Sequence, residues 1–181
     1  MFNRYIAPAL STFILLVSIG INGEEVSQSL FSQVEDQQGI PKGLLYAMAL
    51  QESGRWYKNK RVVWPWTLNV GGKGYYFSSK SDACDALKKE VDDARIYQLG
   101  IGVGQHEWFY QKGRFHSICH ALDPKTNIEK QAEVLLEFYE KTNTWVGAIA
   151  LYHTGNINNK ERTNWGVNYV LKVMGYHENY L

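Results

Sequence analysis

Glu52 is the residue whose type and position are best suited to chemistry. It is the only carboxylate between Asp36 and Asp82, and it ends an apolar run. On a helix Leu45, Met48 and Glu52 share one stripe, so the carboxyl group continues a buried face. Desolvation and the negative end of the helix dipole both disfavour the charged form, so we expect a raised pKa. A carboxylic acid still protonated near neutral pH can act as a general acid, for example toward a glycosidic oxygen.

The alternative is a surface glutamate whose carboxylate reaches water, which is the commoner case for one such residue taken alone. Catalysis would also need partners. Retaining glycosidases pair their acid with a second carboxylate about 5 Å away. No Asp or Glu occurs between Glu52 and Asp82, so the segment directly after the candidate acid cannot supply it. An acid from elsewhere in the chain could still fold into the site.

The elements that must position Glu52 are mostly helices, because helical periodicity dominates after residue 24. Three helices are expected up to Gly100: one that stops at Gly39, one over 41–52, and one that Ser78 or Ser79 caps and that ends by Gly100. Four are expected after it: a short one with Trp108 and Phe109, one opened by a capping box at Thr126–Glu129, one over 145–152 stopped by Gly155, and one over about 165–174. Segment 61–77 places β-branched and aromatic residues around Gly71-Gly72, which predicts a small β-hairpin. The predicted fold class is mainly α, with one hairpin directly after the candidate acid.

The N-terminus has the three-part form of a secretory signal peptide. Arg4 precedes an apolar stretch, and small residues follow at Gly20 and Gly23. Cleavage at the later site would leave residues 24–181, a length suited to one domain. An uncleaved membrane anchor is the alternative, although the polar residues within the stretch weaken it. We therefore expect an exported, periplasmic protein.

Charge and aromatic content restrict the classes of partner. The formal net charge is +1 with both signs interspersed, so we expect neither a nucleic-acid nor an anionic-membrane partner. Phe, Trp and Tyr make up 14% of the chain. Flat amphipathic rings are suited to pack on sugar faces, although each ring taken singly is by default a core residue.

Cys84 and Cys119 are the only cysteines. Export to an oxidising compartment would permit a disulfide between them, but sequence alone leaves open whether they approach each other. Cys119 also lies near His116 and His120, a superficially metal-like cluster of irregular spacing. We expect neither a metal nor a cofactor.

Four short motifs follow one another along the chain: Glu52-Ser53, Gly102-Val103-Gly104-Gln105, Ala150-Leu151-Tyr152-His153-Thr154-Gly155 and Tyr169-Val170. With these motifs in this order, the chain resembles the Slt-type lytic transglycosylases, which share the goose-type lysozyme fold. The resemblance covers essentially residues 24–181. It implies a lysozyme-like α+β domain that acts on peptidoglycan.

The resemblance also implies roles for individual residues. Glu52 would be the catalytic acid and base, and Ser53 and Gln105 would line the sugar cleft. Tyr152 would hydrogen-bond or position Glu52, and Tyr169 would close the site from the last helix. Structural roles are open for each: a helix cap for Gln105, and core packing for the two tyrosines.

The implied reaction needs only one carboxyl group from the enzyme. Glu52 would protonate the oxygen of the MurNAc–GlcNAc β-1,4 bond, with the N-acetyl group of MurNAc as internal nucleophile, and would then activate the muramyl 6-hydroxyl to form a 1,6-anhydro ring. The alternatives are a hydrolytic muramidase and a non-catalytic glycan-binding assembly protein. Small members of the family often accompany conjugation, type IV secretion or pilus machines, so such an assembly is the expected partner of a monomeric enzyme.

Two further features bear on the sugar cleft. His153 stands where the family usually has Asn after the Tyr, an exchange that could make activity depend on pH. Trp64 and Trp66 flank a proline, and we expect one of them on the cleft, with Asn69 offering its amide to an acetamido group. That both tryptophans instead fix the hairpin to the helical part is an equally open interpretation.

Overall fold

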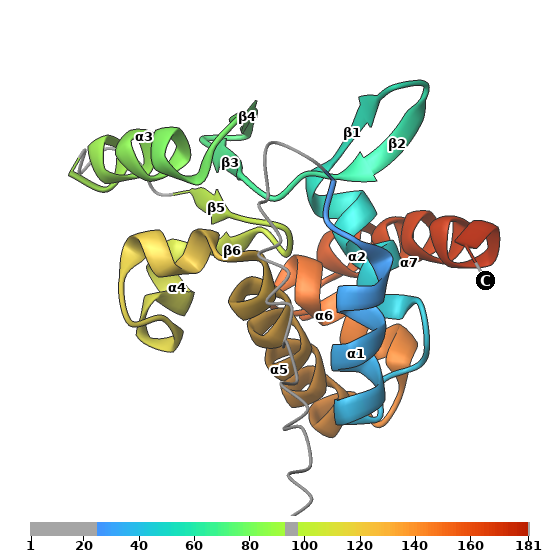
Figure 1. Ribbon diagram of the computed structural model, residues 1–181. Helices are drawn as coiled ribbons and strands as arrows, with labels where there is room; N and C mark the ends of the chain where they lie inside the picture. The colour runs from blue at the N-terminus through green and yellow to red at the C-terminus, as the bar shows by residue number, and fades with distance from the viewer. Residues whose placement is uncertain (1–24, 93–97, 181) are drawn as a thin grey trace, which may run out of the picture.

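The computed structural model describes residues 25–92 and 98–180 of the 181-residue chain. The predicted signal peptide, 1–23, lies outside the described residues. The helices are α1 (Gln28–Gln38), α2 (Leu44–Ser53), α3 (Lys80–Asp92), α4 (Trp108–Gln111), α5 (Pro124–Thr142), α6 (Trp145–Thr154) and α7 (Lys160–Tyr180), with 3-10 turns η1 (Lys112–Arg114) and η2 (Ile118–Leu122). The strands are β1 (Gly54–Tyr57), β2 (Lys60–Val63), β3 (Thr67–Val70), β4 (Lys73–Tyr76), β5 (Leu99–Ile101) and β6 (His106–Glu107). The fold is mainly α with small antiparallel sheets, as predicted (Figure 1).

Helix α2 lies at the centre of a helical lobe formed with α1, α5, α6 and α7 (Figure 1). Every residue from Leu44 to Leu50 is buried, which is why the helix is apolar on all sides. Its N-terminus is capped from a distance, because the Glu35 carboxylate accepts hydrogen bonds from the backbone N–H groups of Gly43 and Leu45, each at 2.8 Å. The prediction that the helix begins at Pro41 is wrong: Gly43, with φ of 80°, is the cap, and Pro41 lies in the turn before it.

The β part is larger than the sequence indicated. The predicted hairpin exists as β3 and β4, and it turns at Gly71 and Gly72 with φ of 58° and 87°. A second hairpin, β1–β2, precedes it, and its turn places Lys58 and Asn59 at positive φ. β3 also pairs with β5, and β5 with β6, which gives the sheet order β4-β3-β5-β6. The short strands β5 and β6 were missed because two or three residues carry no readable alternation.

Most helix ends follow the predicted signals. Gly39 and Gly155 end α1 and α6, both with φ of 68°, and Ser79 caps α3 by accepting from Asp82 N. Two predictions are wrong. Asp123, not a capping box at Thr126, caps α5, because it precedes a proline suited to the first helical position. Helix α7 begins at Lys160 and continues through Gly175, since packing on α2 and α6 outweighs the cost of a helical glycine.

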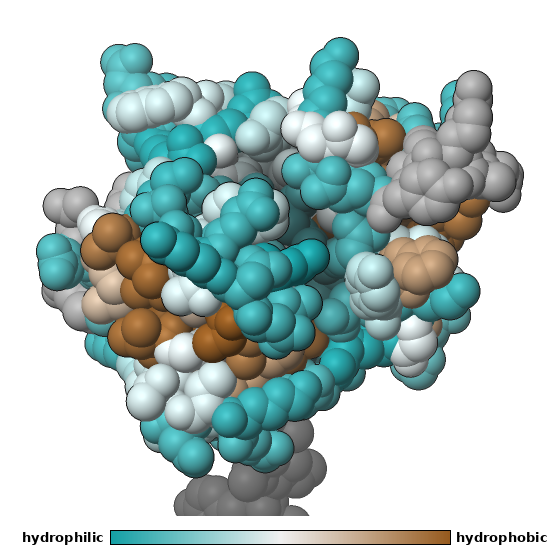
Figure 2. Space-filling model, turned by 180° about the vertical axis from the view of Figure 1, so that it is seen from behind, coloured by the Kyte–Doolittle hydropathy of each residue, from teal (hydrophilic) through white to brown (hydrophobic). Residues whose placement is uncertain are grey.

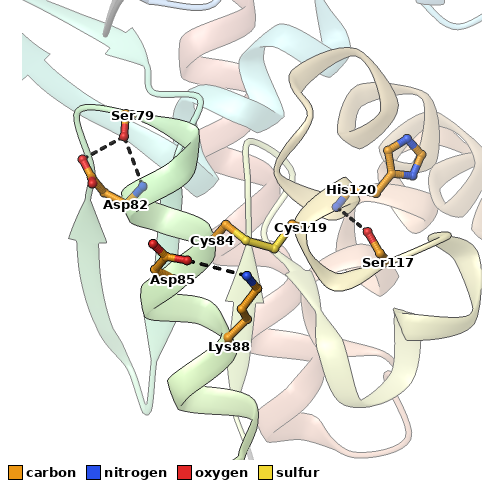
Figure 3. Close-up of a disulfide and its surroundings, with 8 residues drawn as sticks. All are labelled: Ser79, Asp82, Cys84, Asp85, Lys88, Ser117, Cys119 and His120. Atoms are coloured by element: carbon orange, nitrogen blue, oxygen red, sulfur yellow. Dashed lines mark hydrogen bonds and ion pairs between the residues drawn. A yellow bond between two sulfur atoms is a disulfide. The ribbon is translucent and has the colours of Figure 1, made fainter.

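A second apolar cluster holds the sheet against α3 and η2. Its members include Trp66, Leu68, Leu87, Ile101 and Leu122. Cys84 of α3 and Cys119 of η2 form a disulfide across it, with Cα atoms 5.2 Å apart (Figure 3). The bridge therefore ties two elements that no backbone ladder connects.

The outer surface contrasts with these two interior clusters. The face shown in Figure 2 is mostly hydrophilic, with apolar side chains gathered on one part of it. Among residues 25–92 and 98–180, no helix combines the length and the apolar character that crossing a bilayer needs.

We expect loss of the disulfide to destabilise the protein. The double substitution Cys84→Ser and Cys119→Ser should lower the free energy of unfolding by about 2–4 kcal/mol, because the unfolded chain gains the freedom of a long loop. Urea unfolding of the oxidised wild type, the reduced wild type and the variant would measure this. The reduced wild type should match the variant, and an oxidised protein no more stable than either would contradict the prediction.

Candidate active site

A cavity of about 450 Å³ lies where the helical lobe meets the sheet. Its walls are Glu52, Asn69, Gln98, Gly100, Gln105, His106, Glu107, Tyr110, Gln111, Val134, Phe138, Tyr152, His153, Thr154 and Gly155. Four of the predicted site residues are among them: Glu52, Asn69, Gln105 and Tyr152. Most of the lining residues are polar, although polar and apolar atoms contribute similar surface. Hydroxyl, amide and carboxyl groups from both lobes beside apolar surface suit a ligand that combines hydrogen-bonding groups with apolar faces.

Glu52 lies in the last turn of α2 and is half-buried in the cavity wall. Its Oε1 accepts a hydrogen bond of 2.6 Å from the Tyr169 hydroxyl. Burial raises the pKa of Glu52 from 4.5 to about 7, against the smaller opposing effect of this hydrogen bond. The raised pKa expected from the sequence is therefore present, and its main cause is desolvation. Near neutral pH both the acid and the carboxylate form are populated.

Tyr169 reaches Glu52 because α7 packs along α2. Its side chain is buried, and burial together with the Glu52 charge raises its pKa well above its usual value. The phenol consequently stays protonated and donates to the carboxyl group. The His153 ring stacks on the Tyr169 ring, with centroids 4.5 Å apart and planes 1° from parallel. Tyr169 thus lies between Glu52 and His153. It contacts the candidate acid itself, whereas the sequence predicted only that it closes the site from the last helix.

Tyr152 does not donate to Glu52. Its hydroxyl donates instead to the Gly104 carbonyl at 2.7 Å. Burial and the nearby Glu52 charge raise the pKa of Tyr152 well above its usual value. The Tyr152 phenol therefore keeps its proton. Its ring forms part of the cavity wall, and its hydroxyl connects α6 to the turn that follows β5.

That turn is held by Asn127, whose role the sequence reasoning missed. The buried Asn127 Oδ1 accepts from Gly104 N at 2.8 Å, and Nδ2 donates to the carbonyls of Ile101 (3.1 Å) and Ala121 (2.7 Å). Gly102 has φ of 75°, and a Cβ there would lie 2.2 Å from Asn127 Nδ2. The glycine is required by this close approach. An Asn in the first turn of an otherwise apolar helix face was the available signal.

Gln105 and Asn69 present amides to the cavity. Gln105 has φ of 49°, and its Nε2 donates to Gly102 O at 2.7 Å, so the side chain is fixed by its own turn. Asn69, on β3, has its buried Oδ1 without a hydrogen-bond partner among the described residues. A buried acceptor without a partner is costly, and turning the side chain into the cavity would let this oxygen accept from a ligand donor such as an amide N–H.

Ser53, Trp64 and Trp66 do not reach the cavity, so their expected roles in the cleft are wrong. Ser53 is 0% exposed, and its hydroxyl donates to Ala49 O within α2. Trp64 and Trp66 are 5% and 4% exposed. Trp64 Nε1 donates to Phe77 O, and Trp66 belongs to the second apolar cluster. Trp66 therefore packs in the cluster between the sheet, α3 and η2, and Trp64 binds the chain just after β4. Neither belongs to the core of the helical lobe, so the alternative that both fix the hairpin to the helical part is not what these contacts show.

A second carboxylate, Glu107, lines the same cavity from β6. Both of its oxygens lie 3.1 Å from Leu99 N, which donates to them. The raised pKa of Glu52 has burial as its main cause, opposed by the Tyr169 hydrogen bond. Cys119, bonded to Cys84, is not a thiolate ligand, and the described residues contain no group of three or more side chains able to hold a metal ion.

Comparison of the chain with protein-family models, with curated proteins and with solved structures finds no match. The central feature is Glu52, a carboxyl group whose pKa burial raises to about 7, on the cavity wall.

The raised pKa of Glu52 predicts a pH-dependent cost to stability. Its folded pKa, about 7, lies above the unfolded value of 4.5, so the folded state binds the proton more tightly and loses stability as pH rises between these values. The free energy of unfolding of Glu52→Gln should therefore rise relative to that of the wild type by about 3 kcal/mol as the pH increases from 4.5 to 7.5. Above that pH the difference should stay constant. Urea unfolding across this range measures the gain. The same substitution at the exposed Glu140 is the control, and a parallel pH dependence for all three proteins would contradict the prediction.

The hydrogen bond from Tyr169 predicts a second shift. Tyr169→Phe removes a donor to the carboxylate while keeping the ring, so the pKa of Glu52 should rise by about one further unit. Carboxyl-carbon NMR titration of labelled glutamate would record it. Tyr139→Phe, on a ring that packs against Trp145, serves as the matched control. A pKa of Glu52 that stays the same or falls in Tyr169→Phe would be inconsistent with the assigned bond.

Proposed function

We propose that this protein is a lytic transglycosylase that cleaves the MurNAc–GlcNAc β-1,4 bond of peptidoglycan and leaves a 1,6-anhydroMurNAc end. The observation that carries the proposal is Glu52: a carboxyl group with a pKa of about 7 on the wall of a polar 450 Å³ cavity, held by Tyr169. The order of motifs that resembles the Slt-type enzymes agrees with this placement.

In the proposed reaction Glu52 acts twice. Its protonated form gives the proton to the glycosidic oxygen as the bond to the muramyl C1 breaks, and the N-acetyl oxygen of the same sugar attacks that carbon. The resulting carboxylate then takes the proton of the 6-hydroxyl, whose oxygen displaces the N-acetyl oxygen from C1. Tyr169 stabilises the carboxylate between the two steps by its short hydrogen bond. A pKa near 7 suits a group that must exchange roles at neutral pH.

The amides in the cavity are suited to orient this substrate. Asn69 Oδ1, which is buried and lacks a partner among the described residues, would accept from an acetamido N–H once the side chain turns into the cavity. Gln105, fixed by Gly102, and Tyr152, fixed by Gly104, offer a polar wall of fixed geometry. Preorganised groups of this kind lower the entropic cost of holding the N-acetyl oxygen near C1.

Hydrolysis is the second candidate, and Glu107 favours it. Glu107 is a second carboxylate on the cavity wall, and in an inverting glycosidase such a group activates water. Both of its oxygens accept from Leu99 N, which holds the carboxylate against β5, and this is why we prefer the single-carboxyl mechanism. A non-catalytic glycan-binding role would retain the cavity but not the need for Glu52.

The place of action follows from the sequence resemblance alone. We propose that the protein is exported to the periplasm and opens the wall locally for a conjugation, type IV secretion or pilus machine. Its N-terminal residues have the form of a signal peptide, which supports export.

Digestion of purified sacculi, with the soluble products analysed by mass spectrometry, tests the proposal. The wild type and Glu107→Gln should release anhydromuropeptides, whereas Glu52→Gln should release at least about 1000-fold less, because it cannot transfer a proton. Reducing ends from the wild type would identify a muramidase instead. Binding to sacculi without products would identify a non-catalytic protein.

A further inference from the structure

The two hairpins form a cationic surface in a chain whose net charge is only +1. No Asp or Glu occurs between Glu52 and Asp82, whereas this stretch carries six basic residues: Arg55, Lys58, Lys60, Arg61, Lys73 and Lys80. Three of the six are engaged. Lys60 pairs with Glu25 at 2.6 Å, Lys80 with Asp123 at 3.7 Å, and Arg61 donates to Leu50 O.

The other three cations lie on aromatic rings instead. Lys58 lies over Tyr57, Lys73 over Tyr75, and Arg55 over both Trp64 and Tyr76. None of the three has a hydrogen bond or an ion pair with any residue in the part of the chain that the structure describes. Their charges are therefore oriented by rings and are not neutralised by carboxylates.

Arg55 is the most constrained of these cations. Its guanidinium carbon lies 4.4 Å from the centroid of Trp64 and 5.2 Å from that of Tyr76. Both rings are themselves fixed, since Trp64 Nε1 donates to Phe77 O and the Tyr76 hydroxyl donates to Gly54 O. Contact with a ring holds a planar guanidinium without using its N–H donors. The Arg55 guanidinium is thus held in one orientation with its N–H groups free to bind an anion, and no carboxylate of the described residues pairs with it.

The position of Arg55 relates it to the cavity. It lies three residues after Glu52, on the strand that follows α2 directly. Tyr76 pairs with Thr67, and opposed residues of an antiparallel pair share a face, as do Thr67 and Asn69. Tyr76 therefore projects on the same face of the hairpin as Asn69, which lines the cavity. Arg55 and Tyr76 lie outside the cavity lining, on the strands next to the residues Glu52 and Asn69 that belong to it.

We propose that Arg55, between Trp64 and Tyr76, is a subsite for a carboxylate on the peptide stem of the muramyl residue. This inference rests on the proposed function. The sugar rings themselves offer hydroxyl and acetamido groups, which the cavity matches, whereas the peptide substituent brings the negative charge. A guanidinium binds a carboxylate through two parallel N–H donors. Lys58 and Lys73 add positive charge to the same two hairpins. The enzyme accordingly discriminates peptide-bearing glycan from bare glycan.

The test compares two substrates from one source: glycan strands with their stems, and strands from which an amidase has removed them. The measured quantity is the ratio of kcat/KM for the two. The wild type should favour peptide-bearing strands about tenfold, and Arg55→Met should bring the ratio close to one through a higher KM on those strands. Lys88→Met, which removes an exposed cation paired with Asp85, should keep the wild-type ratio. Arg55→Lys should keep part of the preference for peptide-bearing strands, since lysine retains the positive charge but lacks the two parallel N–H donors.

The outcomes separate the subsite from the proposed function. If the wild type cleaves neither substrate, the proposed function fails. If the wild type cleaves both equally well, or if Arg55→Met lowers both activities by the same factor, the subsite is wrong and the function stands. Arg55→Met that keeps the ratio but no longer binds phosphatidylglycerol vesicles would assign the surface to an anionic membrane and overturn the subsite. Salt should reduce the wild-type preference, because a half-exposed ion pair is screened.

Discussion

The hydrogen bond from Tyr169 to Glu52 is the interaction around which the candidate site is built. A carboxyl group enclosed by protein is costly when charged, and without a donor Glu52 would remain a neutral acid over most of the physiological pH range. Tyr169 opposes desolvation enough that the pKa settles at about 7. The bond in turn requires α7 to lie along α2, and that packing is the apolar core of the helical lobe. The chemistry thus depends on where two helices meet.

Buried polar side chains fix the parts of the fold that apolar packing leaves undetermined. Glu35 satisfies two backbone donors at the start of α2, and Asn127 satisfies one donor and two acceptors around the turn after β5. Both lie away from the cavity surface yet determine its shape. His106 belongs to the same group: burial lowers its pKa to about 4, so it stays neutral beside the Asn127 carbonyl. Each satisfies backbone groups that would otherwise be buried without partners.

The parts of the structure that follow local rules were predictable from the sequence. Helix ends at Gly39, Gly155 and Ser79 depend on hydrogen bonds to residues a few positions away. The buried position of Glu52 could be predicted because it continues an apolar stripe of its helix. Ser53 was misplaced for a related reason. Because α2 is buried nearly all round, helical periodicity does not tell which of its faces borders a cavity. The partner of Tyr152 lies 48 residues away, and no local pattern encodes such a contact.

The separation of Glu52 and Tyr169 along the chain has a consequence for the order of folding. The two residues are 117 positions apart, so their contact closes one of the longest loops in the molecule. Long-range contacts form late, because the loop entropy must be overcome before they contribute. A ribosome-bound chain that lacks α7 has the acid but not its donor. Glu52 therefore acquires its hydrogen-bond donor only once α7 has been synthesised.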